Sequence, residues 1–273
     1  MNTTRARNSS NKELYLRFFS ASVIVLLIVA SIYLGETYFG VFVASLFGGI
    51  VFEWLNASGM KARGPGITAL IGVTLLLAAL LLKSWHVALV LWVAVCLIGV
   101  RRRCFDANSS SSFNSKRHRL AQFGLLYAAM SLWALGRAHC VCGKDFIMFV
   151  FACIWLTDTG AFFIGRIIGG PKLAPQISPK KTWSGALGGT ALAAAGGAYL
   201  GVYLLGQLPL ESAWIATELS LLAHFGDLLE SAAKRFLGVK DMGRLVPGHG
   251  GLSDRFDSVL CVSFTYLLFI KLM

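Results

Sequence analysis

Charged residues are scarce in this sequence of 273 residues. Asp, Glu, Lys and Arg together make up 14% of it, against about 25% in a typical soluble domain. Acidic residues are scarcest, with 13 Asp and Glu beside 25 Lys and Arg. So few charged side chains cannot cover a globular surface in contact with water in the usual way. The composition therefore argues against an ordinary soluble domain and favours an integral membrane protein.

Cysteine patterns that would indicate zinc or a disulfide framework are also lacking. The six Cys contain no pair of C-x-x-C motifs, so a zinc site is not expected. Cys140 and Cys142 are separated by one residue, a spacing that rarely gives good disulfide geometry. The cysteines within apolar runs are expected to pack as small apolar side chains.

Long apolar runs are what the sequence has in abundance, and 56% of its residues are hydrophobic. A helix needs roughly 20 mostly apolar residues to cross a bilayer. Nine runs are candidates, some of them short: residues 18–34, 39–55, 67–82, 87–100, 120–135, 146–168, 183–205, 213–225 and 259–272. We therefore predict an all-α, polytopic integral membrane protein with about nine transmembrane helices. The first run is longer than the apolar core of a secretory signal, so we expect it to remain as an anchor.

The distribution of Lys and Arg predicts the orientation of these helices. With nine spans and a cytoplasmic N-terminus, the cytoplasmic segments hold 21 of the 25 Lys and Arg, as the positive-inside rule requires. The C-terminus is then outside, in the periplasm. The net charge of +12 follows from this topology and from attraction to anionic lipid head groups, so no nucleic-acid partner is expected.

The same pattern suggests two parts of the chain. Residues 1–145 are predicted to form an N-terminal transmembrane region of about five spans, with a basic cytoplasmic loop at 101–119. Residues 146–273 are predicted to form a catalytic transmembrane region whose site faces the cytoplasm, because the two most polar stretches of this half lie on that side.

The first polar stretch covers residues 158–185. Asp158 interrupts an apolar run, and an ionisable residue inside a span is a functional candidate by default. The alternative is a carboxylate satisfied by a neighbouring hydroxyl, such as Thr157 or Thr159. Further on, glycines and prolines end the helix, and a new helix start coincides with two hydroxyls and two ammonium groups: Ser178, Lys180, Lys181 and Thr182. This combination suits a phosphate, although the lysines could instead serve only to set topology.

The second polar stretch covers residues 227–257 and contains carboxylates that topology does not explain. Asp227 and Glu230 are three residues apart and share a helix face, and the same spacing relates Asp254 and Asp257. Four carboxylates at the cytoplasmic ends of two helices would suit Mg²⁺. The alternative is that Asp254 caps the last helix and Asp257 lies favourably in its first turn. Basic side chains that could hold phosphates are interleaved: Lys234, Arg235, Lys240, Arg244 and Arg255.

Over these two stretches the chain resembles the bacterial phosphatidate cytidylyltransferases, also called CDP-diacylglycerol synthases. Their long signature is matched by Ser231, Lys234, Arg235, Lys240, Asp241, Gly243, Pro247, His249, Gly250, Gly251, Asp254, Arg255 and Asp257. The upstream element is matched from Asp158 to Trp183. Ala233 and Val246 depart from the usual side-chain size, and Ser184 stands where many members carry Glu, so no carboxylate role is assigned there.

The resemblance implies transfer of CMP from CTP to phosphatidate, giving CDP-diacylglycerol and pyrophosphate in phospholipid biosynthesis. It implies a multi-pass protein of the bacterial inner membrane that binds CTP, phosphatidate and membrane lipids. The Gly- and Ala-rich spans permit helix contacts between subunits, and so a homodimer. The resemblance implies Mg²⁺ at Asp227 and Asp254, with Asp257 and Asp158 as secondary candidates and with room for a second, monovalent or divalent, cation. The implied catalytic residues are Lys234, Arg235, Lys240, Asp241, His249 and Arg255, and the implied substrate-binding residues are Ser178, Lys180, Lys181, Thr182, Gly250 and Gly251.

Two other functional classes are weighed beside this one. A CDP-alcohol phosphotransferase would carry a D-G-x2-A-R element and aspartates four apart, whereas Asp254 and Asp257 are three apart. An ion-binding transporter with broken helices would place its carboxylates near mid-membrane, whereas most of these carboxylates lie at the ends of runs.

Overall fold

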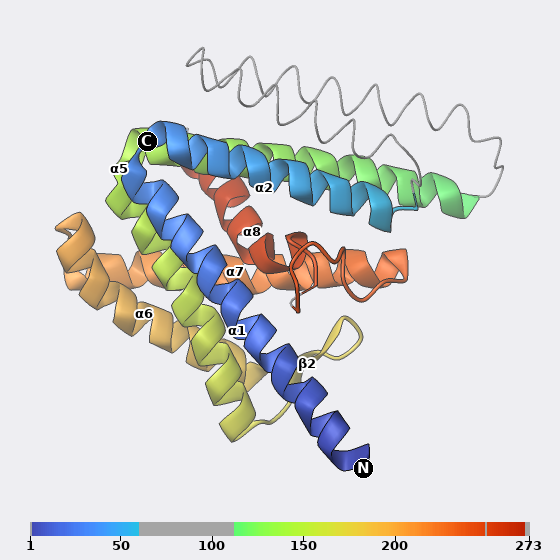
Figure 1. Cartoon of the computed structure of the whole chain (residues 1–273). Helices are drawn as coiled ribbons and strands as arrows, with labels where there is room; N and C mark the ends of the chain where they lie inside the picture. The colour runs from blue at the N-terminus through green and yellow to red at the C-terminus, as the bar shows by residue number, and fades with distance from the viewer. Residues whose placement is uncertain (1, 60–111, 249, 271–273) are drawn as a thin grey trace.

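The structure is a computed structural model that describes residues 2–59, 112–248 and 250–270. These residues form a mainly helical protein, as predicted, with one small β-hairpin (Figure 1). In chain order the elements are α1 (Asn2–Leu34), α2 (Glu36–Ala57), α5 (Ser112–Ile168), β1 (Lys172–Ala174), β2 (Ser178–Thr182), α6 (Trp183–Leu205), α7 (Pro209–Leu237) and α8 (Ser253–Ile270).

Three of the described helical segments are long and apolar enough to cross a membrane, namely Glu36–Ala57, Arg119–Ile168 and Trp183–Leu205. The apolar part of α1, Phe18–Leu34, is shorter. The predicted spans 67–82 and 87–100 lie outside the described residues, as does most of the basic loop 101–119. The count of nine spans, the sidedness of the termini and the division at residue 145 therefore stay predictions.

Helix α5 contains two of the predicted spans, 120–135 and 146–168, within one element. They meet at Gly143, whose backbone (φ 83°, ψ 172°) is not helical. Such a positive φ is readily adopted by glycine. The chain changes direction sharply here, so the first half of α5 lies along α2 while the second half descends beside α1 and α6 (Figure 1).

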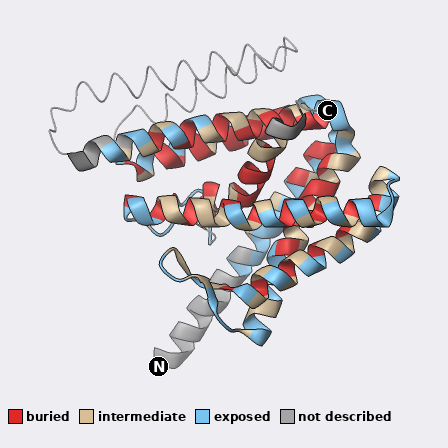
Figure 2. Cartoon of the chain, turned by 180° about the vertical axis from the view of Figure 1, so that it is seen from behind, coloured by how far each residue is buried: buried red, intermediate tan, exposed pale blue. Residues whose placement is uncertain are grey.

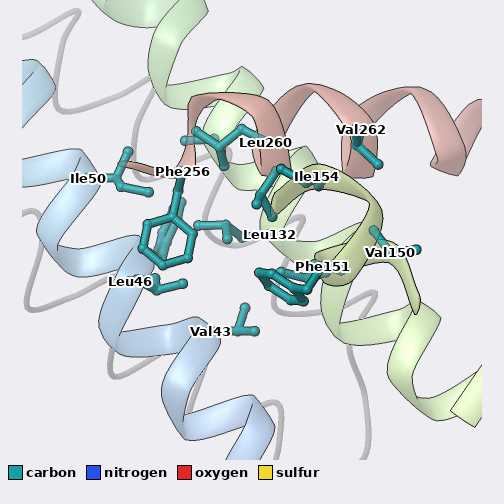
Figure 3. Packing of buried hydrophobic residues seen from close by; sticks show 14 of the residues in the cluster. Val43, Leu46, Ile50, Leu132, Val150, Phe151, Ile154, Phe256, Leu260 and Val262 are labelled. Carbon is teal, nitrogen blue, oxygen red and sulfur yellow. The ribbon is translucent and has the colours of Figure 1, made fainter. Parts of the chain in front are cut away.

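The hydrophobic core forms where α2, both halves of α5 and α8 meet. Figure 3 shows side chains from these helices interdigitating, among them Ile50, Leu132, Phe151 and Phe256. All four are at most 2% exposed. Helix α2 is therefore packed directly against the start of α8, which carries two of the predicted metal ligands.

Helix α6 contacts its neighbours through its smallest residues, and Figure 2 shows little of it fully buried. Its buried positions recur every fourth residue: Gly185, Gly189, Ala193, Gly197 and Gly201. A Cβ atom on Gly189 would lie 2.5 Å from the carbonyl oxygen of Thr157 in α5. Glycine thus allows α5 and α6 to approach closely, the packing expected of small residues in membrane helices.

The structure contains a β-hairpin, β1–β2, that the all-α prediction did not include. Lys172 pairs with Thr182 and Ala174 with Ser178, in antiparallel register. Gly169 and Gly170 end α5 with positive φ angles of 65° and 100°, and the three prolines at positions 171, 175 and 179 disfavour a continuing helix. The hairpin projects from the helices beside α7 (Figure 1).

Candidate active site

A pocket of roughly 860 Å³ lies where the end of α5, the hairpin, the start of α6, the second half of α7 and the start of α8 come together. Its volume is in the range typical of small-molecule sites. The predicted residues that line it are Asp158, Ser178, Lys180, Lys181, Thr182, Asp227, Lys234, Asp241, Asp254, Arg255 and Asp257. The fold therefore gathers both polar stretches of the sequence at one place.

Other residues predicted for the site do not line the pocket, namely Glu230, Arg235, Lys240, Arg244, Gly250 and Gly251. His249 lies outside the described residues. Arg235 donates from Nε to the carbonyl oxygen of Ile177 at 3.2 Å, and so connects the end of α7 to the hairpin.

Asp227 on α7 forms an ion pair with Lys181 on β2. The hydroxyl of Ser231, one turn further along α7, donates to the same carboxylate at 3.3 Å. The side chains of Lys181 and Asp227 are 21% and 32% exposed, so solvent or a ligand can reach the pair. This contact joins the two polar stretches directly.

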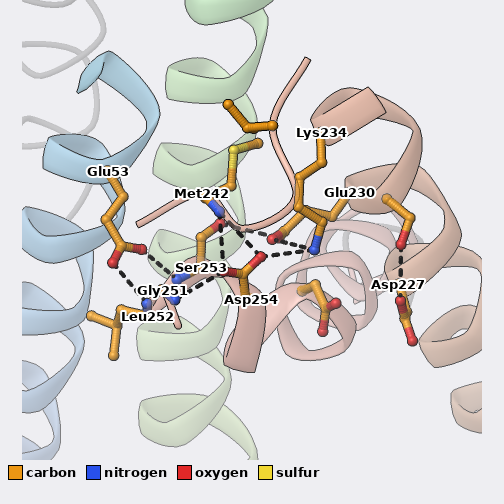
Figure 4. A network of polar contacts seen from close by, with 12 residues as sticks. Glu53, Asp227, Glu230, Lys234, Met242, Gly251, Leu252, Ser253 and Asp254 are labelled. Carbon is orange, nitrogen blue, oxygen red and sulfur yellow. Dashed lines mark hydrogen bonds and ion pairs between the residues drawn. The ribbon is translucent and has the colours of Figure 1, made fainter. Parts of the chain in front are cut away.

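Asp254 in the first turn of α8 accepts hydrogen bonds on both oxygens. Lys234 Nζ donates to Oδ1 at 2.8 Å, and the amides of Gly251 and Met242 donate to Oδ2 at 2.9 Å and 3.1 Å (Figure 4). The capping alternative therefore needs correction: the amides that Asp254 binds belong to the loop before the helix rather than to the first turn of α8. Asp254 organises that loop and holds Lys234.

Lys234 is buried between two carboxylates. Its Nζ atom lies 2.8 Å from Asp254 Oδ1 and 3.6 Å from Glu230 Oε1, and the residue is 9% exposed. Burial opposes the charged form of Lys234, but Glu230 and Asp254 overcome that effect and raise its pKa. Lys234 therefore presents a fixed positive charge to the pocket.

Asp257 lies one turn further along α8 and also lines the pocket. The pKa of Asp257 is raised to about 7, first by burial and then by the nearby charges of Asp227 and Asp158. Carboxylates that crowd together in this way repel one another when ionised. The pocket thus has an excess of negative charge on this side.

The phosphate-binding prediction needs one geometric correction. Lys180 and Lys181 lie on strand β2 and not at the start of a helix, since α6 begins at Trp183. Thr182 is the N-cap of α6, and its hydroxyl oxygen accepts from the amide of Gly185 at 3.1 Å. Thr182 thus satisfies one of the free amides at the start of α6, and the cationic groups that this segment brings to the pocket, Lys180 and Lys181, lie on the hairpin.

Comparison with known proteins now identifies the family. A sequence model of the cytidylyltransferase family matches residues 15–273. The chain belongs to this family. It is 33% identical over 212 residues to a phosphatidate cytidylyltransferase of Staphylococcus saprophyticus, covering 77% of this chain and 81% of that protein.

Other relatives in the cytidylyltransferase family match a shorter stretch. A phosphatidate cytidylyltransferase of Brucella suis is 45% identical over 152 residues, which is 54% of this chain and 55% of that protein. A phosphatidate cytidylyltransferase of Bacillus subtilis is 44% identical over 130 residues, which is 46% of this chain and 48% of that protein. The chain thus matches about half the length of these curated relatives.

Three ionisable pocket residues of this cytidylyltransferase-family chain were given no individual role from the sequence. Arg166, Lys172 and His224 line the pocket. Arg166 lies within the element matched from Asp158 to Trp183 but received no role of its own, and nothing in the local spacing of Arg166 and Lys172 shows that α5 and the hairpin turn them towards the other site residues.

Glu53 on α2 was also overlooked. It is 1% exposed and accepts hydrogen bonds from the amides of Leu252 and Ser253, both at 2.9 Å. The signal was present, because Glu53 interrupts the apolar run 39–55 just as Asp158 interrupts its own run. The rule that flagged Asp158 would have flagged Glu53.

The fit of the site to a metal ion rests on its carboxylates. Within residues 2–59, 112–248 and 250–270, no three His, Cys, Asp or Glu side chains are already arranged as a metal-binding group. Asp158, Asp227, Asp254 and Asp257 nevertheless line one pocket, and burial and neighbouring charge raise the pKa of Asp257 there. Carboxylate oxygens are the donors that Mg²⁺ takes, so the residue types that line the pocket fit such an ion.

Proposed function

We propose that this protein transfers the CMP group from CTP to phosphatidate, giving CDP-diacylglycerol and pyrophosphate. The observation that carries the proposal is the pocket at the ends of α5, α7 and α8, which combines six Lys and Arg side chains with five aspartates among its lining residues. Both substrates are anions that repel each other, and such a mixed site can bring them together. The names of the relatives agree with this activity.

In the proposed reaction a phosphate oxygen of phosphatidate attacks the α-phosphorus of CTP. A new phosphorus–oxygen bond forms, the bond from the α-phosphorus to the bridging oxygen breaks, and its electrons leave with pyrophosphate. The phosphate monoester of phosphatidate has a second pKa of about 6 and is largely dianionic at neutral pH, so no strong base is required. Catalysis is then mainly positioning and charge stabilisation.

The cations of the site supply that stabilisation. Lys180, exposed on β2, and Lys181 are placed to bind phosphates that enter from the aqueous side. Lys234 and Arg255 line the pocket beside Asp254, where they can neutralise charge that develops on the phosphates.

We further propose that Asp227 and Asp254 hold Mg²⁺, with Asp257 and Asp158 as additional oxygen donors. When bound, such an ion would neutralise phosphate charge and orient the attacking and leaving groups. A second cation is compatible with the number of carboxylates in the pocket.

The lipid substrate accounts for the apolar surface near the pocket. Phe162 lines the pocket and is 58% exposed, and Ile167 and Leu187 nearby on α5 and α6 are 80% and 67% exposed. Acyl chains could thus stay in the bilayer while the phosphate enters the pocket. We therefore place the protein in the bacterial inner membrane with this pocket facing the cytoplasm, and a homodimer is compatible with the Gly-rich helices.

Incubation of the purified protein with CTP labelled at the α-phosphate tests the proposal. Label should enter the lipid fraction when phosphatidate and Mg²⁺ are present, and unlabelled pyrophosphate should be released in equal amount. Asp227→Asn serves as the inactive control and Glu218→Gln, an exposed residue of the same helix, as the active one. No label in lipid would overturn the proposed function, and ion flux without transfer would indicate a transporter instead.

A further inference from the structure

The loop before α8 is held from two sides by buried carboxylates of different helices. Asp254 accepts from the amides of Met242 and Gly251. From the opposite side, Glu53 of α2 accepts from Leu252 and Ser253 at 2.9 Å and from Leu245 at 3.4 Å. Together they bind five backbone amides of the segment 242–253, as Figure 4 shows for four of them.

The loop sequence is adapted to this contact. A Cβ atom on Gly243 would lie 2.3 Å from Glu53 Oε1. One on Gly251 would lie 2.8 Å from both Glu53 Oε2 and Asp254 Oδ2. Real Cβ atoms do not approach other atoms so closely, so glycine at these two positions is what lets the loop contact both carboxylates.

The contact with α2 extends to the pocket. Trp54 Nε1, next to Glu53, donates to the hydroxyl of Ser253 at 3.1 Å. That hydroxyl donates to Glu230 Oε2 at 3.1 Å, and Glu230 in turn lies beside Lys234. A continuous set of polar contacts thus connects an N-terminal helix to the cation and the aspartate at the base of the pocket.

We infer that Glu53 is a positioning residue for the reaction: it anchors the loop 242–252 to α2, so that Asp254 and Lys234 stay in place at the pocket. The negative charge matters, because both oxygens of Glu53 accept from amides at the N-terminal end of α8, where a helix favours an anion. A glutamine would turn a donor towards one of those amides. The kinetic part of this inference rests on the proposed function; the anchoring of the loop does not.

Two measurements on the full chain in lipid nanodiscs test the inference, with Glu53→Gln compared with Glu36→Gln. Glu36 is exposed at the far end of the same helix, so the control makes the same charge change away from the loop. Glu53→Gln should lower kcat at saturating CTP and phosphatidate by about 10- to 100-fold, the usual effect of losing a residue that orients a catalytic group, with a smaller change in KM. Hydrogen exchange should speed up in residues 242–253 and not in the core segment 147–154.

The outcomes separate the alternatives. Unchanged kcat, or exchange that speeds up equally in both segments, would overturn the inference and leave Glu53 as a general core residue. If Glu53→Gln is not recovered folded, Gly243→Ala takes its place, because its added Cβ atom displaces the Glu53 carboxylate from the loop side. Gly243→Ala should also lower kcat and speed up exchange in residues 242–253. Wild-type kcat and exchange in Gly243→Ala would also overturn the inference. If the wild-type protein transfers no CMP, the exchange measurement still tests the anchoring, and the proposed function alone fails.

Discussion

At the scale of single residues, Asp254 and Asp227 have different surroundings although they are proposed to share a metal ion. Asp254 is buried among three donors, whereas Asp227 is partly exposed and paired with Lys181. Asparagine offers only one acceptor oxygen, so it cannot replace Asp254 as it could replace a simple helix cap. The asparagine substitutions should therefore have different effects on stability at the two positions.

We predict that Asp254→Asn lowers both activity and stability, by roughly 3 kcal/mol for the latter, because it breaks a buried charge pair. Asp227→Asn should keep the wild-type unfolding temperature but lose activity on the order of 100-fold, as expected when a metal ligand that stabilises the transition state is removed. Transfer assays and thermal unfolding in detergent measure both. Full activity and unchanged Mg²⁺ dependence in Asp227→Asn would contradict the metal assignment.

The raised pKa of Asp257 predicts that the stability of the protein depends on pH. This pKa is raised from 3.8 to about 7, first by burial and then by Asp227. The pKa of Asp257 is higher in the folded than in the unfolded protein. Its favourable contribution to the free energy of unfolding is therefore complete below the unfolded-state pKa and is lost as the pH rises through about 7.

We compare the unfolding temperatures of Asp257→Asn and the wild type in metal-free buffer. The wild type should lose stability relative to the variant as the pH rises from 4 to 7, so the variant's unfolding temperature minus the wild type's should increase over that range and level off above it. Added Mg²⁺ should reduce the difference by neutralising the carboxylates. A difference that does not vary with pH would show that Asp257 is not held in its neutral form.

At the scale of elements, the hairpin and α7 build the site together. Helix α7 continues to Leu237, 12 residues beyond the predicted span 213–225, and this extension carries Asp227 and Lys234 to the pocket. The hairpin lies against it through Lys181 and Arg235. An amphipathic helix extension and a short hairpin thus position charges that come from separate stretches of the sequence.

Replacing the hairpin lysines tests whether they bind substrate or only set topology. Lys180→Ala combined with Lys181→Ala should raise the KM for CTP or for phosphatidate by about 10-fold or more, since hydrogen bonds to charged groups contribute roughly 1.5–3 kcal/mol. Lys116→Ala, which removes an exposed lysine of α5 outside the pocket, is the control. Unchanged KM for both substrates in the double variant would return these lysines to a topological role.

At the scale of the whole molecule, the proposed reaction requires the pocket to face the compartment that contains CTP. The Lys and Arg distribution predicts that the N-terminus and the pocket are on the cytoplasmic side and the C-terminus outside. A reporter fused after Met273 that is active only in the periplasm should therefore be active, and one fused before Asn2 should be inactive. The opposite result would reverse the placement of every loop, including those that carry the site.

The sequence by itself determined the helical membrane class, the residues of the two polar stretches and the family signature. These properties are local: apolar run length, charge and spacing are visible in any window of the chain. The helix α6, for example, has the bounds predicted for its span, because Thr182 begins it and Gly206 ends it.

Only the tertiary structure decided which of those residues meet. Arg166, Lys172 and His224 join the pocket because helices and a hairpin converge there, whereas Lys240, although inside the signature, does not line it. Glu53 reaches the loop before α8 across 200 residues of sequence, a contact that depends on the packing of α2 against α8. Hydrogen bonds and ion pairs act over a few ångströms, and no spacing pattern within one segment records which distant segment will lie at that distance.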